Sequence, residues 1–293
     1  MYKIGIIGSD NSHAEAFSQA INIPDSVTGE YMFPDCRVIG IYGEDRERTL
    51  QVATDGKIEY IAVNPIDLMG KVDAVMVVFR HGDLHMPHAL PFIEAGIPVW
   101  IDKPFTIKNE DAIKLIKAAE KNGTLLTGGS TCKYSYDIAM AKNAVAGNSR
   151  IGKVKSAIMS FPAEIENEYG GLYFYGAHLV EMTLEAFGYN ANSVVATENC
   201  GSVIAIVKYD SFQVVMNFIP DLRQYHVLLY GENGILDREI DISLAYMLGL
   251  HKFVEMLRSG KLPMPLELLY KSVEMLNAVV DSYRTGNEIF IKK

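Results

Sequence analysis

The stretch GIIGSDNSHAEAF, residues 5–17, carries residue types that could hold the phosphates of a dinucleotide. In a dinucleotide-binding fold, three glycines after the first strand allow a tight turn, close approach of the pyrophosphate, and packing of the helix on the strand. Here Gly8 occupies the first position, whereas Asp10 and His13 occupy the second and third. A side chain at the second position blocks the approach, and a carboxylate there repels phosphate. The loop alone therefore leaves two interpretations open, a structural turn and a cofactor loop.

The residues around Asp10 still favour an anion. Ser12 is expected to cap the following helix, because Glu15 stands three residues later in the arrangement of a capping box. The start of that helix offers amide donors and a partial positive charge. Ser9 and Asn11 are small and polar. We therefore expect cofactor contacts from Ser9, Asn11 and Ser12.

The second apolar run ends in IYGEDRER, residues 41–48, where a ribose-binding acid is expected. Glu44 or Asp45 could hold the adenosine ribose hydroxyls and favour NAD, whereas Arg46 or Arg48 could meet a 2′-phosphate and favour NADP. A solvated helix start is the alternative interpretation. We expect NAD or NADP, with NAD slightly favoured and Glu44 as the contact.

Three histidines, His81, His85 and His88, stand at spacings of four and three residues in RHGDLHMPH. On one helical face they could hold zinc. Pro87 breaks that spacing, however, so we expect no metal site.

The elements that must position these residues change character along the chain. Over the first 130 residues, short apolar runs alternate with helical patterns, which is typical of a doubly wound parallel sheet. We expect strands at 2–8, 36–43, 59–63, 72–79, 97–102 and 124–129, and helices from Ser12 and at 44–54, 85–96 and 109–123.

After residue 130, strands follow one another through turns, which favours antiparallel pairing. We expect a helix at 135–147, strands at 153–162, 193–200, 202–210 and 212–220, a further strand region at 226–237, and a long helix at 265–286. The pattern predicts two domains, residues 1–128 and 129–293, and leaves open that the final helix packs back on the first.

Composition limits the possible partners. The chain has 293 residues, 49% hydrophobic and 22% charged, and its 27 basic and 36 acidic residues give a net charge of −9. Without a Lys/Arg run, an acidic protein is a poor candidate for binding nucleic acid or an anionic membrane. No apolar run approaches the ~20 residues that span a bilayer, and the N-terminus has no signal-peptide pattern. The three cysteines are far apart, so we expect reduced thiols in a cytoplasmic protein.

A more specific indication comes from four segments in order. Residues 72–93 contain a valine-rich strand, a turn and then a Leu-His pair, and residues 94–123 contain Asp-Lys-Pro. Residues 170–182 read GGLYFYGAHLVEM, and residues 268–291 combine a helix with a short strand. This ordered set resembles the glucose-fructose oxidoreductase / inositol dehydrogenase / MocA (Gfo/Idh/MocA) family over nearly the whole chain. The resemblance implies an α/β protein with an N-terminal Rossmann domain and a C-terminal α/β domain on an open, mostly antiparallel sheet.

The resemblance also implies residue roles. Lys103 would lie beside the nicotinamide and the reacting carbinol, and His178 would face it from the second domain. A histidine can take the hydroxyl proton as the carbonyl forms, and a lysine can polarise the oxygen or act as the base. Tyr175 is a weaker candidate for a proton relay. Cofactor contacts are expected from Gly8, Ser9, Asn11, Ser12, Glu44, Arg80, His81, His85, Asp102 and Pro104.

Departures from the family pattern weaken this interpretation. Besides Asp10 and His13 in the loop, Arg80-His81-Gly82 replaces the family's Thr-Pro-Asn, and Phe174 replaces an Asp four residues before His178. Asp10 and Arg80 follow strands that are neighbours at the switch point of such a sheet. We therefore hypothesise that Asp10 and Arg80 form an ion pair.

The sequence thus predicts an NAD(P)-dependent oxidoreductase for a sugar, polyol or related small carbonyl or hydroxyl compound, with residues 163–176 lining the substrate pocket. A homo-oligomer, dimer or tetramer, through the C-terminal sheet is implied by the resemblance. The main alternative is a catalytically degenerate member that binds or senses a metabolite. Two further alternatives are an enzyme that catalyses hydrolysis or elimination through transient oxidation, and a non-catalytic interaction module.

Overall fold

The computed structural model describes residues 1–291, and this part of the chain divides into two compact units. Unit 1 comprises Met1–Thr106, Glu110–Gly129 and Gly249–Leu269, and unit 2 comprises Ile107–Asn109, Ser130–Leu248 and Tyr270–Lys293. The main boundary between the two units falls between Gly129 and Ser130. A later segment, Gly249–Leu269, returns to unit 1, whereas the final helix belongs to unit 2 from Tyr270 onward.

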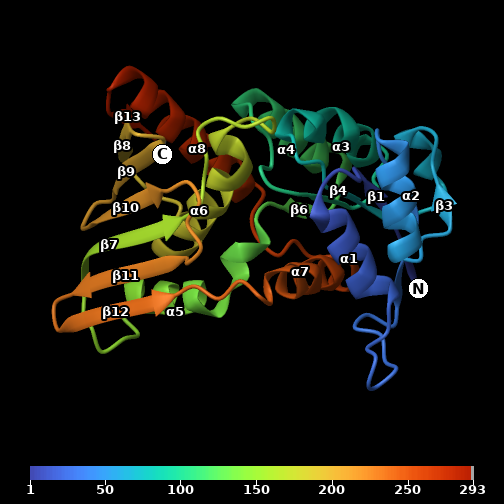
Figure 1. The fold of residues 1–293 in the computed structure, drawn as a ribbon, viewed down its shortest axis with the longest axis horizontal. Coiled ribbons are helices and arrows are strands. Elements are labelled where there is room, and N and C mark those ends of the chain that lie inside the picture. Colours follow the sequence, from blue (N-terminus) through green and yellow to red (C-terminus); the bar gives the residue numbers. More distant parts are fainter. Residues whose placement is uncertain (292–293) are drawn as a thin grey trace. The chain divides into compact units, whose positions relative to one another are not determined.

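Unit 1 is built on sheet A, whose six parallel strands have the order β3-β2-β1-β4-β5-β6 (Figure 1). The central strands are apolar and buried, as strands covered on both faces must be. The strands are β1 (Tyr2–Ile7), β2 (Cys36–Tyr42), β3 (Tyr60–Ile61), β4 (Ala74–Val77), β5 (Val99–Ile101) and β6 (Leu126–Gly128). In this order the switch point, where ligands bind in such sheets, lies between β1 and β4.

The helices of unit 1 cover this sheet. The α1 and α2 helices pack beside each other and against β2, and α3 packs against β4 and β5 (Figure 1). They span α1 (Ser12–Asn22), α2 (Arg46–Asp55), α3 (His85–Glu94) and α4 (Asn109–Asn122), with short 3-10 turns at η1 (Pro65–Leu68) and η2 (Gly82–Leu84). The sequence analysis contained no helix at α7 (Ala245–Ser259), which joins unit 1 from Gly249 onward. Its Phe253 ring meets the Trp100 ring edge-on at 6.1 Å.

Unit 2 is built on sheet B, with seven strands in the order β12-β11-β7-β10-β9-β8-β13. All neighbours are antiparallel except β7 and β10, so this mixed sheet and the parallel sheet A confirm the predicted α/β fold class. The strands are β7 (Val154–Phe161), β8 (Ser193–Asn199), β9 (Ser202–Lys208), β10 (Gln213–Phe218), β11 (His226–Gly231), β12 (Gly234–Glu239) and β13 (Ile289–Phe290).

The helices of unit 2 are η3 (Thr131–Tyr134), α5 (Tyr136–Val145), α6 (Leu172–Phe187) and α8 (Glu267–Thr285). The α6 helix packs on β7 and β10, so its buried side carries both core residues and candidate site residues (Figure 1). The α5 helix packs on β11 and β12.

One local expectation was wrong. Asn11, not Ser12, caps α1: its Oδ1 accepts a hydrogen bond from the backbone N–H of His13. Ser12 is the first helical residue, and the Glu15 carboxylate pairs with Arg48 at 2.9 Å. Asn and Ser have nearly equal preference for the cap position, so local sequence could not choose between adjacent residues.

Candidate functional site

The loop after β1 retains one obligatory glycine. Gly8 has φ of +106°, which favours glycine, and a Cβ at this position would lie 2.8 Å from the backbone N of Phe79. The loop after β1 is therefore packed directly on the chain that leaves β4. This contact brings together the two loops that border the switch point of sheet A.

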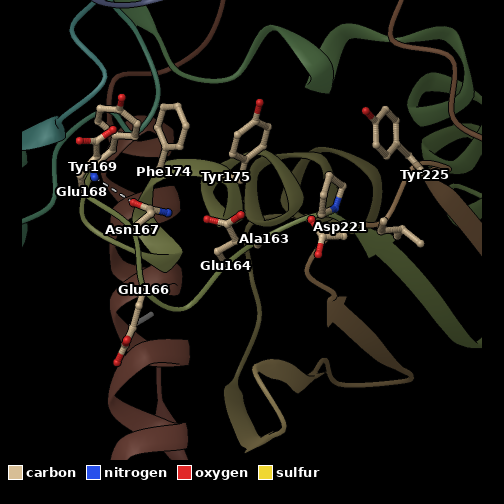
Figure 2. A pocket seen from close by; sticks show the side chains of 12 residues that line it. Ala163, Glu164, Glu166, Asn167, Glu168, Tyr169, Phe174, Tyr175, Asp221 and Tyr225 are labelled. Carbon is tan, nitrogen blue, oxygen red and sulfur yellow. Dashed lines mark hydrogen bonds between the residues drawn. The ribbon is translucent and has the colours of Figure 1, made fainter.

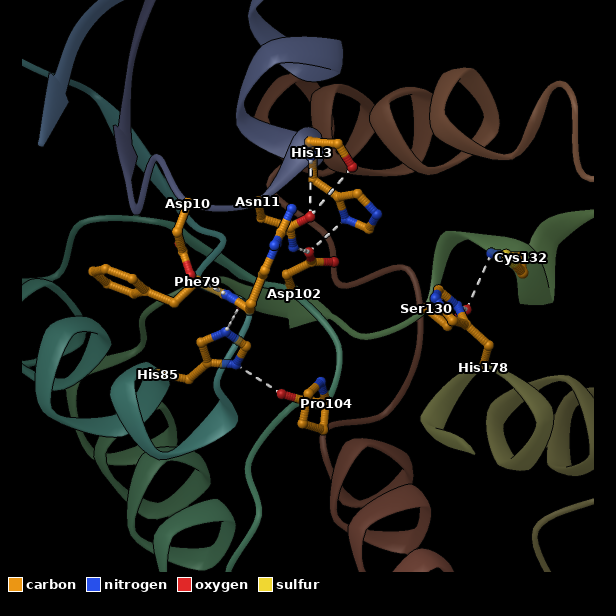
Figure 3. Close-up of polar contacts among 12 residues, drawn as sticks. Asp10, Asn11, His13, Phe79, His85, Asp102, Pro104, Ser130, Cys132 and His178 are labelled. Carbon is orange, nitrogen blue, oxygen red and sulfur yellow. Dashed lines mark hydrogen bonds and ion pairs between the residues drawn. The ribbon is translucent and has the colours of Figure 1, made fainter. Parts of the chain in front are cut away.

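Asp10 strengthens the same contact (Figure 3). Its Oδ2 accepts a hydrogen bond of 3.1 Å from the backbone N–H of Arg80. Its Oδ1 is buried and has no hydrogen-bond partner among residues 1–291. Asp10 and Arg80 are thus close together, as predicted, and the contact is made by the backbone N–H of Arg80. The ion pair with the guanidinium stays a prediction.

Ser9 and Asn11, two predicted cofactor contacts, use their side chains within unit 1. Ser9 is 1% exposed, and its Oγ lies 2.8 Å from Thr49 Oγ1. Asn11 caps α1 and its Nδ2 donates to Asp102 Oδ2 at 3.3 Å. Their backbone and not their side chains is left to meet a ligand. Ser12, by contrast, is exposed at the first turn of α1.

His13 joins the loop to the end of β5 (Figure 3). Its Nδ1 lies 2.5 Å from Asp102 Oδ2, and both side chains are buried. Burial raises the pKa of Asp102, but the charge and hydrogen bond of His13 and the charge of Lys103 outweigh it, so the pKa is lowered. Asp102 is therefore a buried carboxylate held by the residue that replaces the third glycine. From the sequence, His13 was noted only as the residue at the third glycine position.

His85 holds the next turn. Its Nδ1 lies 2.7 Å from the carbonyl oxygen of Pro104, and its Nε2 lies 2.9 Å from that of Phe79. Desolvation lowers the pKa of this fully buried histidine, although the facing carbonyls oppose the shift. His85 thus ties the end of β4 to the Lys103-Pro104 turn, whose peptide bond is cis.

Lys103 itself is 2% exposed, an unusual degree of burial for a lysine. It lies between Asp102 and Pro104, both also buried, at the carboxyl end of β5. Arg80 and His81 are half-buried, and the His81 ring caps the 3-10 turn η2. Glu44 is exposed just after β2.

In unit 2, His178 is placed by α6 and is 5% exposed. Its Nδ1 lies 2.7 Å from Ser130 Oγ (Figure 3). Its ring contacts those of Tyr175 and Phe161. Ser130 was not among the predicted residues. It follows β6 directly after two glycines, a position that could have drawn attention to it.

Glu181, one turn after His178, anchors Ser130. Its Oε1 accepts from the backbone N–H of Ser130, and its Oε2 pairs with Lys133 Nζ, both at 2.8 Å. Burial lowers the pKa of Lys133, but Glu181 outweighs this effect and the pKa is raised. A buried, hydrogen-bonded ion pair thus holds the segment that carries Ser130 against α6.

A cavity of about 660 Å³ opens in unit 2 (Figure 2). Eight of its lining residues fall within 163–176, the segment predicted to line the substrate pocket, and Tyr175 is among them. The lining contains four carboxylates and four aromatic rings but no lysine, arginine or histidine. The lining residues are Pro162, Ala163, Glu164, Glu166, Asn167, Glu168, Tyr169, Phe174, Tyr175, Asp221, Leu222 and Tyr225.

The wall of this cavity is held by Asn167, which lies within the predicted segment 163–176 but was not singled out there (Figure 2). Its Oδ1 accepts from the backbone N–H groups of Tyr169 and Gly171, both at 2.9 Å. Its Nδ2 donates to the carbonyl of Gly171 at 3.1 Å. Gly171 has φ of +64°, and a Cβ there would lie 2.1 Å from the Ile165 carbonyl oxygen. The loop therefore has one well-defined conformation.

No group of three or more His, Cys, Asp or Glu side chains within residues 1–291 is placed to hold a metal ion. His85 uses both ring nitrogens on carbonyls, and His88 Nδ1 lies 2.8 Å from the Leu84 carbonyl. No helix in the same range is long and apolar enough to cross a membrane.

Comparison with known proteins gives a family match for unit 1. Residues 2–130 match GFO_IDH_MocA, described as an oxidoreductase family with an NAD-binding Rossmann fold. The chain is 25% identical over 171 residues to the scyllo-inositol 2-dehydrogenase (NADP(+)) IolW of Bacillus subtilis strain 168, covering 54% of this chain and 45% of that protein. It is 26% identical over 122 residues to the uncharacterised oxidoreductase YhhX of Escherichia coli K12, covering 39% and 35%. The chain thus spans less than half the length of these curated relatives.

Solved structures share the fold over the whole chain. GenD2 from gentamicin A biosynthesis, in complex with NAD, has a TM-score of 0.84 at 17% identity, covering 100% of this chain and 97% of that one. The scyllo-inositol dehydrogenase of Lactobacillus casei, with NAD(H) and scyllo-inositol bound, has a TM-score of 0.82 at 13% identity, covering 99% of each chain. At these identities the likeness concerns the fold.

Proposed function

We propose that the chain is a member of the Gfo/Idh/MocA oxidoreductase family, whose model matches residues 2–130, and that it is an NAD(P)-dependent dehydrogenase or reductase. Its substrate would be a sugar, a polyol or a related small carbonyl or hydroxyl compound. The observation that carries this proposal is the buried Lys103, at the carboxyl end of β5 in a six-stranded sheet of dinucleotide-binding order. The names of IolW and of the L. casei enzyme, both inositol dehydrogenases, support the class of substrate.

The residues of unit 1 fit a dinucleotide in three respects. The Gly8 turn leaves no room for a Cβ, the first turn of α1 offers amide donors, and Glu44 is exposed where the ribose is expected. The buried Asp10 Oδ1 is an acceptor without a donor, so it suits a hydroxyl or N–H group of a ligand and not a phosphate oxygen. Side chains of Ser9 and Asn11 hold the loop, and the contacts we propose for them come from the backbone.

We favour NAD over NADP. The Glu44 carboxylate would repel a 2′-phosphate, and Arg48, one of two arginines that could attract it, is paired with Glu15 at 2.9 Å. Replacing Glu44 by Ser should raise the affinity for NADP about tenfold relative to that for NAD, equivalent to about 1.4 kcal/mol. If the Glu44→Ser variant kept the wild-type ratio of NADP affinity to NAD affinity, Glu44 would not be a cofactor contact.

The proposed chemistry divides between cofactor and protein. A bound nicotinamide supplies the hydride acceptor or donor. The protein must move the hydroxyl proton and hold the substrate oxygen, and we propose Lys103 and His178 for these tasks, with Tyr175 as a relay. Lys103 lies in the turn that His85 holds through the Pro104 carbonyl, and Nδ1 of His178 lies 2.7 Å from Ser130 Oγ. Proton transfer by a positioned side chain contributes about 10²–10⁴-fold to a rate.

The unit 2 cavity supports a polyhydroxylated substrate. Carboxylates and tyrosine hydroxyls can accept and donate hydrogen bonds to several substrate hydroxyls at once. Four carboxylates without a cation in the lining disfavour anionic compounds such as sugar acids and sugar phosphates. Neutral polyols are therefore the compounds to screen first.

The outer face of sheet B supports a homo-oligomer. Its inward residues belong to the core of unit 2, whereas outward apolar side chains stand in register on five neighbouring strands. This half-buried row consists of Leu228, Ile158, Val215, Ile206 and Val195. We propose that a second copy covers this face in a dimer or tetramer.

The oligomer is tested by placing a charge in the middle of the row. Val215→Glu should reduce the mass measured by light scattering to that of the monomer, because burying an unpaired carboxylate is costly. Val63→Glu, at a residue of unit 1 that is 78% exposed, is the control. A wild-type monomer, or a Val215→Glu variant of unchanged mass, would contradict the proposal.

The function itself is tested first by calorimetry, which measures the binding of NAD, NADH, NADP and NADPH. Neutral sugars and polyols are then screened as substrates, and turnover is followed by the absorbance of the reduced nicotinamide. Micromolar binding of one form with turnover of a polyol is the expected result. No binding at millimolar concentration would overturn the proposal and favour the metabolite-binding alternative. Turnover without net reduced cofactor would instead indicate transient oxidation.

A further inference from the structure

Ser130 Oγ has two hydrogen-bond partners within residues 1–291. The backbone N–H of Cys132 donates to it at 3.2 Å, and Nδ1 of His178 lies 2.7 Å away. Ser130 is fully buried, and its own backbone N–H is held by Glu181. The position of this hydroxyl is therefore set from three sides, and only the location of its hydrogen is left to decide.

Counting donors and acceptors decides it. A serine hydroxyl has one hydrogen and two lone pairs, and the Cys132 N–H uses one lone pair. If Nδ1 of His178 also donated, the serine hydrogen would be buried without an acceptor, which costs about 1–3 kcal/mol. If instead the serine donates to Nδ1, every group is satisfied. The Ser130 hydroxyl hydrogen thus belongs on the side of His178.

We infer that Ser130 donates its hydroxyl hydrogen to Nδ1 of His178 and so keeps the neutral imidazole protonated at Nε2. In the family pattern that this sequence resembles, an acid stands four residues before the histidine, and a carboxylate in contact with Nδ1 would act as an acceptor there. Here that position is Phe174, and both oxygens of the nearest carboxylate on α6, Glu181, are engaged by Ser130 N and Lys133 Nζ. Exchanging an acceptor for a donor at Nδ1 reverses the role of Nε2.

The consequence for the reaction rests on the proposed function. A neutral His178 with Nε2–H donates a hydrogen bond to the substrate oxygen and keeps its proton. A bound nicotinamide would supply the hydride acceptor for oxidation, and the hydroxyl proton would pass to the amine form of Lys103 as the carbonyl forms. Ser130 is a positioning residue, Lys103 is the proton acceptor, and His178 is the hydrogen-bond donor.

The tautomer is measured directly by two-bond ¹H–¹⁵N correlation spectra of ¹⁵N-histidine-labelled protein at about pH 8.5, where an unperturbed histidine is neutral. His178→Gln identifies the signals of His178. The wild type should show Nε2–H. Ser130→Thr should keep this tautomer, whereas Ser130→Ala should shift it toward a mixture with Nδ1–H. Ser135→Ala is the matched control, because Ser135 is a buried serine of the same segment whose Oγ has no partner among the described residues.

An Nδ1–H signal in the wild type, or identical tautomer populations in wild type and Ser130→Ala, would overturn the inference. The catalytic roles are tested on the polyol found by screening. His178→Gln, which retains an N–H donor, should keep at least tenfold more kcat/KM than His178→Ala. Equal losses would overturn the donor role. If no polyol is turned over, the proposed function and the roles fail together, while the Ser130 tautomer is decided by the spectra alone.

Discussion

Polar side chains at the strand ends of sheet A and those around the cavity of unit 2 are used in opposite ways. In unit 1, Asn11, His13 and Asp102 are buried and bonded to one another. In unit 2, Glu164, Glu166 and Glu168 are exposed and have no ion-pair partner among the described residues. In unit 1 these side chains therefore fix the conformation of the loop, and only backbone groups are left for the proposed ligand. In unit 2 the side chains themselves are exposed for such contacts.

This difference matches what each region is proposed to recognise. A dinucleotide is a constant ligand, and backbone amides at a helix start suit its phosphates. A polyol varies in the number and orientation of its hydroxyls, and exposed side chains on a loop suit such variation. Four substitutions test the contrast, from the largest expected effect to the smallest.

Lys103→Met should lower kcat/KM about 10²–10⁴-fold, because it removes the proposed proton acceptor. The dissociation constant for NAD should change less than threefold, since the contacts that we propose for the cofactor lie in the β1–α1 loop. Steady-state kinetics and calorimetry check the two parts. Lys114→Met, at an exposed lysine of α4, is the control. Near-normal turnover by Lys103→Met would show that the buried lysine is structural.

His13→Ala should lower the free energy of unfolding by about 3 kcal/mol, because the buried Asp102 carboxylate then loses His13 and keeps the longer hydrogen bond from Asn11. His226→Ala is the matched control, since the His226–Asp237 pair is 44% and 61% exposed and should contribute less than about 1 kcal/mol. Urea unfolding measures both. Equal losses in the two variants would contradict the picture of an internally bonded loop.

The His13–Asp102 pair should also make the free energy of unfolding depend on pH. The pKa of Asp102 is lowered in the folded protein, so its contribution is complete above the unfolded value of about 3.9 and is lost as pH falls through the folded value. The wild type should therefore lose more stability below about pH 4 than His13→Ala does. Parallel stability curves of the two proteins in that range would argue against a charged Asp102.

Gly8→Ala should destabilise unit 1 by about 2 kcal/mol or more, because it adds a clash with the Phe79 backbone to the strain of a positive φ. Gly123→Ala has φ of +63° and nothing within 4 Å of the added Cβ, so it should cost only about 1 kcal/mol. Thermal unfolding compares them. Dinucleotide affinity should fall in the first variant only.

Glu164→Gln should leave the free energy of unfolding within about 0.5 kcal/mol of the wild type, because the side chain is exposed. It should raise the KM for the polyol a few-fold and reduce the discrimination against a sugar acid. Kinetics with one neutral and one anionic compound check this. A stability loss as large as that of His13→Ala would remove the contrast between the two regions.

Much of the fold could be predicted from local sequence. The apolar runs at β1 and β4 are buried strands of a parallel sheet, as their composition indicated, because a strand covered on both faces needs apolar residues throughout. The α7 helix was missed, although its apolar residues recur at helical spacing. The segment 163–176, predicted to line the substrate pocket and rich in acids and tyrosines that suit hydroxyl groups, lines most of the unit 2 cavity.

The sequence by itself determined the alternation of strands and helices, the Gly8 turn and the positions of Lys103 and His178 in recognisable motifs, because these depend on neighbours within a few residues. Only the tertiary structure decided what surrounds them. Ser130 meets His178 across 48 residues of chain, and His13 meets Asp102 across 89. Such contacts depend on the packing of distant elements, which no local pattern encodes, and they determine which atom of a side chain carries a proton.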